Sequence, residues 1–287
     1  MHPGIKLKQL LTKENPLVLP GVYDGLSAAI ARHVGFEAVY MSGAAVSYST
    51  LGKPDIGLTT MTEMVEHASN IFDATGQAIV ADADTGFGNA LNVMRTVKAY
   101  EKAGVACIQI EDQVMPKRCG HMSGKAIIPA DEMVGKIKAA CDARVCEDFM
   151  IMARTDARAV SGPEEAIERG YMYKEAGADA LFLEAPQNQE EMRRFCQAFR
   201  DIIMLANMVE GGRTPILPLK TLKEIGYSWV IYPGACARIV AKALTGLYGE
   251  IRKKGSTAEY LDHMFVFGEL NEILRLSELR EQEKSYA

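Results

Sequence analysis

Three acidic residues follow two successive apolar runs of the sequence. Asp82 and Asp84 close the run at 78–84, and Glu111 lies near the end of the run at 106–112. If both runs are strands, the two aspartates point to the same side and the glutamate lies at the next strand end. Grouped carboxylates need a cation, and a few oxygen ligands completed by water suit Mg²⁺, with Mn²⁺ as a substitute. Acids at such positions also cap helices, but three at adjacent strand ends favour a metal site.

A thiol lies among cations directly after the second of these runs, in the segment KRCGH at 117–121. The other cysteines are interpreted as small buried hydrophobes, whereas the neighbours of Cys119 are too polar for a core position. A thiol with an ordinary pKa of about 8.5 is only ~3% ionised at pH 7 and can donate a proton. Neighbouring cations favour the thiolate, and nearby carboxylates oppose it. Cys119 is therefore a candidate acid or nucleophile, and both roles stay open.

Eight short apolar runs recur along the chain between longer segments of helical pattern. Near-continuous apolar runs are typical of strands in a parallel sheet that is buried on both faces, and the intervening segments are long enough for crossover helices. Four helix-to-strand joints carry a glycine, at Gly35, Gly104, Gly177 and Gly226, where we expect the left-handed backbone that ends helices. The runs span 17–23, 38–43, 78–84, 106–112, 149–156, 180–186, 202–208 and 229–234.

Polar or small functional groups end six of the eight runs. In a closed (β/α)8 barrel of the TIM type these ends converge on one mouth, whereas an open doubly wound sheet would spread them along an edge. We therefore predict an α/β fold with a TIM-type barrel as a single domain over 1–287. Residues 235–287 are expected to form the eighth helix and a helical tail, which packs either on its own barrel or on a neighbouring subunit. The end groups are Ser42, Asp82, Asp84, Glu111, Arg154, Glu184 and Asn207.

The composition excludes several classes of partner. The net charge of −5 is spread without a basic block, which argues against nucleic acid. There is no apolar run of 18 or more residues and no apolar core of a signal peptide near the N-terminus, so we expect a protein without a membrane segment. The six cysteines are scattered without a CxxC pair, which favours the cytoplasm. A small molecule is the expected partner.

The motifs together resemble the isocitrate lyase/phosphoenolpyruvate mutase superfamily. The resemblance extends from about residue 17 to the C-terminus and is strongest to the short members: methylisocitrate lyase, dimethylmalate lyase, oxaloacetate hydrolase and carboxyphosphonoenolpyruvate mutase. The combination of KRCGH with DAD and EDQ in this order is specific for the superfamily but not for one substrate. The matching stretches are 42–44, 51–55, 82–84, 111–113, 117–121, 153–156, 184–185 and 206–207.

The resemblance implies an assembly and a set of ligands. The eighth helix is expected to swap between subunits, with dimers paired into a homotetramer. Mg²⁺ is expected on Asp84, with Asp55, Asp82 and Glu111 reached directly or through water. Backbone N–H groups would bind the α-carboxylate of the substrate, and Arg154 would bind its hydroxyl or keto oxygen. The residues implied for the carboxylates are Ser42, Gly43 and Ala44 for the first, and Asn207, Glu184 and His121 for the other.

The chemistry that these groups suit is a reverse Claisen cleavage of a 2-hydroxy dicarboxylate. The 2-hydroxyl loses its proton, the adjacent carbon–carbon bond breaks, and the fragment that leaves as an enediolate is protonated on carbon. Cys119 is the predicted proton donor, with Lys117 and His121 as catalytic neighbours. Tyr40 is the candidate base, either through its ionised form or through a bound water.

Departures from the superfamily narrow the substrate. Methylisocitrate lyases carry an arginine in the C-terminal helix for a third carboxylate, and Phe267 aligns there. The segments 184–186 and 207–214 also resemble the dimethylmalate lyase and oxaloacetate hydrolase branch, or the carboxyphosphonoenolpyruvate mutase branch, more than methylisocitrate lyase. We therefore expect cleavage of 2,3-dimethylmalate to pyruvate and propionate, with another 2-alkylmalate, oxaloacetate and methylisocitrate as alternatives. A carboxyphosphonoenolpyruvate mutase shares KRCGH and stays as the second candidate. A non-catalytic binding protein would have been signalled by a broken metal site or by loss of Cys119.

Overall fold

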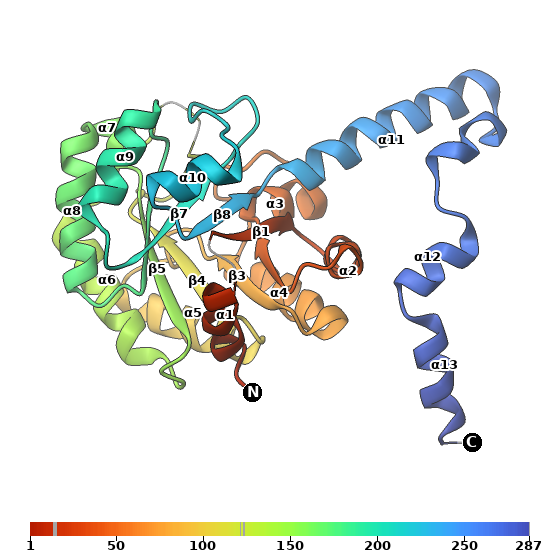
Figure 1. Ribbon diagram of the computed structural model, residues 1–287, viewed down its shortest axis with the longest axis horizontal. Helices are drawn as coiled ribbons and strands as arrows, with labels where there is room; N and C mark the ends of the chain where they lie inside the picture. Colours follow the sequence, from red (N-terminus) through yellow and green to blue (C-terminus); the bar gives the residue numbers. More distant parts are fainter. Residues whose placement is uncertain (14–15, 121, 123, 287) are drawn as a thin grey trace.

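Eight parallel strands close a barrel in the computed structural model, which describes residues 1–13, 16–120, 122 and 124–286 (Figure 1). The strands pair in chain order, and β1 completes the ring by pairing with β8. The predicted TIM-type barrel is therefore confirmed. The strands are β1 Leu17–Val22, β2 Ala38–Met41, β3 Ala78–Asp82, β4 Cys107–Glu111, β5 Met150–Thr155, β6 Ala180–Leu183, β7 Ile203–Asn207 and β8 Trp229–Tyr232.

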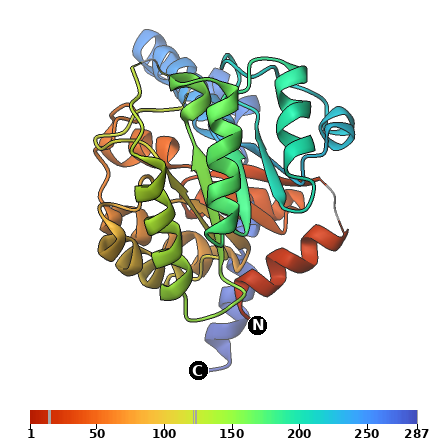
Figure 2. The same cartoon turned by 90° about the vertical axis from the view of Figure 1, so that its left-hand side faces the viewer.

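Helices follow the strands and cover the outside of the barrel (Figure 2). They are α2 Gly25–Val34, α3 Gly43–Leu51, α4 Met61–Thr75, α5 Ala90–Lys102, α6 Ala130–Ala143, α7 Ala157–Val160, α8 Pro163–Glu175, α9 Gln189–Ala198 and α10 Leu219–Ile225. A first helix, α1 Pro3–Lys13, precedes the barrel. Within the described ranges, the helices are all too short or too polar to cross a membrane.

The interior of the barrel is apolar toward the amino ends of its strands. Leu7 and Leu10 of α1 are buried in the same cluster as Leu17, Ala78 and Trp229. This packing closes the amino end of the barrel, because α1 supplies apolar side chains to it. The functional groups are therefore left at the opposite, carboxyl end, where active sites of this fold lie.

The glycines at the four helix-to-strand joints adopt the backbone predicted for them. Gly35, Gly104, Gly177 and Gly226 have φ of 107°, 84°, 107° and 117°. A side chain would be strained at these angles. The chain can therefore leave each helix and enter the next strand within a few residues.

The helix after β8 leaves the barrel (Figure 1). Helix α11, Ala235–Lys254, has no buried residue, and apolar side chains such as Ile239 and Tyr248 are 70% and 61% exposed. The short helix η1 Ala258–His263 leads to α12 Phe267–Ile273 and α13 Leu276–Lys284. Helix α12 approaches α2 and buries Ile273. The tail after α11 thus contacts its own barrel through α12, one of the two alternatives predicted for it, whereas α11 itself buries no residue.

Candidate active site

A cavity of about 190 Å³ opens at the carboxyl ends of the strands. Its lining brings together residues from β2, β3, β5, β6, β7 and β8 with residues of the loops and helices that follow. Of the residues predicted from the sequence, Tyr40, Ser42, Ala44, Asp55, Asp82, Cys119, Arg154, Glu184 and Asn207 line it. Gly43, Asp84, Glu111 and Lys117 are in contact with these lining residues. His121 lies outside the described residues.

The start of α3 forms one wall of the cavity. Ser42 caps this helix, because its hydroxyl accepts from the N–H of Ala45 at 3.3 Å. A Cβ on Gly43 would lie 2.8 Å from Oδ2 of Asp82, so the close approach requires glycine. The N–H of Ser42 donates to the carbonyl of Val22 at 3.1 Å and is engaged within the fold. The first N–H groups of a helix have no partner inside it, so those of Gly43 and Ala44 are the ones suited to an anion.

The two aspartates after β3 are brought together by a turn. Asp82 is the last residue of β3, whereas Asp84 follows the strand and has a left-handed φ of 46°. The N–H of Asp84 donates to Oδ1 of Asp82 at 3.0 Å. The alternation of side chains along a strand, on which the sequence argument relied, therefore does not extend to Asp84, although the grouping of the two acids is as predicted.

Lys117 is the cation at the centre of an acidic cluster formed by Asp55, Asp82, Asp84 and Glu111. Its Nζ lies 2.5 Å from Oδ1 of Asp55 and 2.8 Å from Oδ1 of Asp84, and its side chain is 3% exposed. Burial acts to lower the pKa of Lys117, but the surrounding carboxylates, with Asp84 and Glu111 foremost, raise it well above its ordinary value. The lysine is thus charged and acts as a counter-ion to the cluster. It is too tightly paired to act as a base.

The cluster retains unused acceptor oxygens. Oδ2 of Asp84 and Oε1 of Glu111 are buried and have no hydrogen-bond or ion-pair partner among the described residues, whereas Oδ1 of Asp84 faces Lys117 and Oε2 of Glu111 faces Arg154. Burial raises the pKa of Asp84 to about 6, with Asp82 and Asp55 acting in the same direction against Lys117. Burial likewise raises the pKa of Glu111 well above its usual range. An additional cation would remove this electrostatic cost.

The donor set fits a hard divalent ion that keeps some of its water. Within the described part of the chain, no three Asp, Glu, His or Cys side chains already form a group that could hold a metal by themselves. Mg²⁺ characteristically binds through one or two carboxylates and retains several waters. The oxygens of Asp84 and Glu111 that accept no hydrogen bond are suited to such an ion, so the residues present fit the group that was predicted for them.

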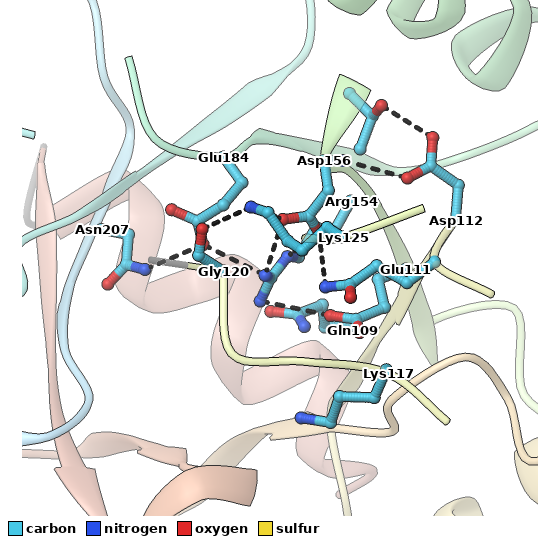
Figure 3. A network of polar contacts seen from close by, with 12 residues as sticks. Gln109, Glu111, Asp112, Lys117, Gly120, Lys125, Arg154, Asp156, Glu184 and Asn207 are labelled. Carbon is cyan, nitrogen blue, oxygen red and sulfur yellow. Dashed lines mark hydrogen bonds and ion pairs between the residues drawn. The ribbon is translucent and has the colours of Figure 1, made fainter. Parts of the chain in front are cut away.

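Arg154 of β5 crosses the floor of the cavity and contacts three carboxylates (Figure 3). Its Nε and Nη2 donate to Asp156 at 3.0 and 3.2 Å, and its Nη1 lies 3.3 Å from Oε2 of Glu111. Its Nη2 lies 3.4 Å from Oε2 of Glu184, which also accepts from Nδ2 of Asn207 at 3.1 Å. Burial acts to lower the pKa of Arg154, but Asp156, Glu111 and Glu184 raise it well above its ordinary value. The guanidinium is a fixed positive charge at the base of the cavity.

The segment that carries the thiol lies over Arg154. The N–H of Cys119 donates to the carbonyl of Asp55 at 3.2 Å. A Cβ on Gly120 would collide with Nη2 of Arg154 and would lie 2.7 Å from Oε2 of Glu184. The backbone beside Cys119 is therefore in close contact with the side chains of Arg154 and Glu184. The predicted position of the thiol over the mouth of the barrel agrees with this geometry.

Tyr40 is held as a hydrogen-bond donor. Its hydroxyl donates to Oε1 of Gln109 at 2.7 Å, and Nε2 of Gln109 donates to Asp82 at 3.2 Å. Burial raises the pKa of Tyr40 well above its ordinary value, and Asp82 acts in the same direction. The ionised form of Tyr40, one of the two forms considered for the base, is therefore disfavoured at neutral pH. The other candidate for the base, a water bound beside Tyr40, agrees with this geometry.

Comparison with known proteins places the chain in a family. The family model described as phosphoenolpyruvate phosphomutase matches residues 7–252. The chain belongs to this family. It is 52% identical to "2,3-dimethylmalate lyase" of Eubacterium barkeri over 287 residues, which cover 100% of this chain and 99% of that protein. It is 45% identical to "2-methylisocitrate lyase" of Aeropyrum pernix over 273 residues, covering 95% and 87% of the two chains.

The similarity extends to solved structures of the phosphoenolpyruvate mutase/isocitrate lyase superfamily. A crystal structure of "2,3-dimethylmalate lyase" superposes with a TM-score of 0.95 at 35% identity, covering 100% of this chain and 96% of that one. The resemblance read from the motifs is therefore confirmed for the superfamily and for the barrel.

Several polar residues of the site were missed by sequence reasoning. Gln109 lies two residues before Glu111 on β4 and opposite Asp82 in the strand register, so strand alternation could have revealed it. Asp156 belongs to a motif that was noted, but its role as the main partner of Arg154 was not predicted. Lys125 and Gln113 lie in the loop after β4 and also contact Asp156. Gln113 ends the EDQ motif, but its role was not predicted, and Lys125 carried no signal in the sequence.

Proposed function

We propose that the chain is a Mg²⁺-dependent carbon–carbon lyase that cleaves 2,3-dimethylmalate to pyruvate and propionate. The observation that carries this proposal is the lining of one cavity by Arg154, the Cys119 thiol and the start of α3, next to the acidic cluster. They supply a fixed cation, a proton donor for the departing carbon and an anion-binding site, which a retro-Claisen cleavage of a 2-hydroxy dicarboxylate requires. The full-length similarity to a lyase of that name supports the substrate.

The substrate would be held at both of its ends. The N–H groups of Gly43 and Ala44 at the start of α3 would bind one carboxylate. The amide of Asn207, aligned by Glu184, would contact the other. His121 is part of the same proposal on the basis of its sequence motif alone. With both ends fixed, the bond to be broken lies over Arg154.

The negative charge that develops on the C2 oxygen during cleavage would be stabilised by Arg154 and by the metal ion. Arg154 would donate to the oxygen at C2 as the hydroxyl proton leaves, and it is pre-oriented for this by Asp156. Mg²⁺ held by Asp84 and, directly or through water, by Asp82, Asp55 and Glu111 would supply Lewis-acid stabilisation of negative charge on the substrate oxygens. Lys117 would keep Asp55 and Asp84 in place.

The cleavage requires a proton donor, and the thiol can take this role. Breaking the C2–C3 bond leaves its electron pair on C3 of the departing enediolate, which must receive a proton before propionate is released. Cys119, on the loop above, would deliver this proton. The hydroxyl proton would leave to a water beside Tyr40, because Tyr40 itself is protonated.

We extend the proposal to the assembly and the compartment. Helix α11 leaves the barrel with its apolar side chains exposed, so we propose that it packs on a second copy and receives the equivalent helix in return, within a homotetramer. Cys107, Cys119, Cys141, Cys146, Cys196 and Cys236 are free thiols, which suits the reducing cytoplasm.

The decisive experiment is a substrate screen with Mg²⁺ present. Release of pyruvate from 2,3-dimethylmalate, with a kcat/KM above those for other 2-alkylmalates, oxaloacetate and 2-methylisocitrate, is the expected result. Phosphonate formation from carboxyphosphonoenolpyruvate without cleavage of any hydroxy acid would assign the chain to the mutases instead. A Cys119→Ser variant in the same screen is the control against contaminating lyase activity.

A further inference from the structure

The loop that carries Cys119 begins and ends at one place on the barrel. Gln113 and Ile127 form an antiparallel bridge, and the N–H of Val114 donates to the carbonyl of Ala126 at 2.9 Å. These contacts fix the two ends of the loop. They do not reach Cys119, which lies near the middle, so its position needs contacts of another kind.

Lys125 supplies such a contact from within the loop. Its Nζ lies 2.6 Å from Oδ1 of Asp156 and donates also to the carbonyl of Gly120, the residue after the thiol (Figure 3). The side chain of Lys125 is 2% exposed and that of Asp156 is fully buried. A lysine is rarely buried to this degree unless it is paired. Its ammonium group therefore joins the loop backbone to the floor of the barrel.

Asp156 joins this loop to the substrate-binding arginine. The same carboxylate accepts from Nε and Nη2 of Arg154 and from Nε2 of Gln113, the last at 3.1 Å. Gln113 in turn bonds the backbone of Arg118 on both sides, donating to its carbonyl and accepting from its N–H at 2.9 Å each. Thus the backbone before the thiol, the backbone after it and the guanidinium of Arg154 all converge on Asp156.

We propose that Lys125 is a positioning residue, which acts through Asp156 and the Gly120 carbonyl to hold the Cys119 thiol in register with the guanidinium of Arg154. This role rests on the proposed function, in which Cys119 protonates the departing fragment above Arg154. The alternative is that Lys125 only neutralises Asp156. The close approach of Gly120 to Arg154 and Glu184 argues for a positional role, because a small shift of the loop changes these contacts at once.

The kinetic test is Lys125→Met, which keeps the length of the side chain and removes the charge and the donors. We expect kcat to fall by about 10²-fold, as misplacement of a reacting group by roughly 1 Å does, and KM to change little, because the carboxylate-binding groups are untouched. The matched control is Lys174→Met on α8, which removes an exposed ion pair with Asp201 and should leave kcat and KM as in the wild type. Wild-type kcat in Lys125→Met would overturn the proposal.

A double-mutant cycle shows whether Lys125 acts through the thiol. If it does, Lys125→Met should add almost nothing to the loss already caused by Cys119→Ser, since there is no thiol left to position. If the two losses multiply instead, Lys125 acts on another group and the proposal is wrong.

A second readout does not depend on turnover. Alkylation by iodoacetamide, followed at each cysteine by peptide mass, should become several-fold faster at Cys119 in Lys125→Met and stay unchanged at Cys146. Asp156 keeps Arg154 as its cation, so the Tm should fall much less than in a variant whose buried carboxylate loses its cation altogether. Equal acceleration at both cysteines with a lowered Tm would mean that Lys125 supports the fold in general, which overturns the positioning role. If the wild type cleaves no hydroxy acid, the proposed function fails, and the alkylation rates still decide whether Lys125 positions the thiol.

Discussion

The ammonium group of Lys117 lies 2.8 Å from the carboxylate of Asp84, at the centre of the acidic cluster beside the cavity. This single cation faces Asp55, Asp82, Asp84 and Glu111, all of which contribute to its raised pKa. Arg154 also faces Glu111 but is shared with Asp156 and Glu184, so Lys117 and Arg154 together do not balance these carboxylates. The relationship therefore explains how the cluster is stable as a unit and also why it would bind a further cation.

The first prediction is that activity and Mg²⁺ binding are lost together in Asp84→Asn. Oδ1 of Asp84 pairs with Lys117, whereas Oδ2 has no partner among the described residues, so Oδ2 is the oxygen suited to bind the metal directly. We expect Mg²⁺ affinity, measured by titration calorimetry, to fall by at least ~10²-fold, since loss of even an outer partner of a metal costs roughly 10 to 100-fold. Asp131→Asn, at an exposed acid in the first turn of α6, is the control. Full activity of the wild type in excess chelator would contradict the metal assignment.

The second prediction concerns the role of Cys119 as an acid. Cys119→Ser keeps the shape of the side chain but replaces the thiol by a much weaker acid, so kcat should fall by something like 10² to 10⁴-fold. KM should barely change, because in the proposed function the substrate carboxylates are held by Gly43, Ala44 and Asn207. Cys146→Ser, at a cysteine that does not line the cavity, should behave as the wild type. Detection by mass spectrometry of a covalent adduct on Cys119 during turnover would show that the thiol is a nucleophile instead.

The strands and the position of the site could be predicted because their signals are local. Each strand is a near-continuous apolar run, and the residues at its carboxyl end are fixed at the mouth once the barrel closes. The joint glycines are equally local, since their backbone angle follows from the residue type. The packing of the tail after α11 was not predictable, because its amphipathic pattern fits its own barrel and a neighbouring one equally well.

The hydrogen bonds among the buried polar residues could not be predicted, because they join segments that are distant in the chain. Tyr40 and Gln109 are 69 residues apart, and Lys125 and Asp156 are 31 apart. Such contacts depend on the register between strands and on loop conformation, which residue periodicity does not determine. The raised pKa of Tyr40 follows from its burial and could not have been deduced before the register was known.

The third prediction is that Gly120→Ala inactivates the enzyme without unfolding it. The added Cβ would collide with Arg154 and approach Glu184, and the loop must then move away from both. We expect kcat/KM to fall by roughly 10²-fold, the effect of a shift of about 1 Å, with a wild-type Tm. The control is Gly135→Ala in α6, where a Cβ meets nothing within 4 Å and should slightly stabilise the helix. Equal activities of the two variants would show that the loop has room to move.

The fourth prediction concerns the buried ion pair between Asp112 and Arg169. Asp112 accepts from Arg169 at 3.0 Å and from the N–H of Asp156 at 2.9 Å. Arg169→Met leaves the buried carboxylate without its cation and should lower the free energy of unfolding by about 3 to 5 kcal/mol. Arg194→Met, which removes an exposed pair with Glu164, should cost less than about 1 kcal/mol. Thermal unfolding of both variants at equal protein concentration provides the comparison.

The pH dependence of the stability of Arg169→Met gives an independent check. Burial raises the pKa of Asp112 above its ordinary value, so the folded protein binds this proton more tightly than the unfolded chain. A neutral carboxyl does not need the arginine, and the stability deficit of Arg169→Met should therefore shrink as the pH is lowered toward that pKa and grow as the pH rises. A deficit that is constant with pH would mean that lost packing, and not the unpaired charge, destabilises the variant.

The last prediction is discrimination against tricarboxylates. Phe267, at the position where the sequence resemblance implies an arginine in methylisocitrate lyases, begins α12 and is 87% exposed, so we expect a second copy of the chain to bring it to a cavity. In the assembly we propose, a third carboxylate would find no cation there. At ~3 kcal/mol for an unpaired charge, kcat/KM for 2-methylisocitrate should be lower than that for 2,3-dimethylmalate by at least roughly 10². Phe267→Arg should narrow this gap, whereas Phe265→Arg, which adds the same charge at a side chain that is 57% exposed, should not. Equal cleavage of both substrates by the wild type would refute the role of Phe267, and equal effects of the two arginines would mean that net charge, not position 267, attracts the tricarboxylate.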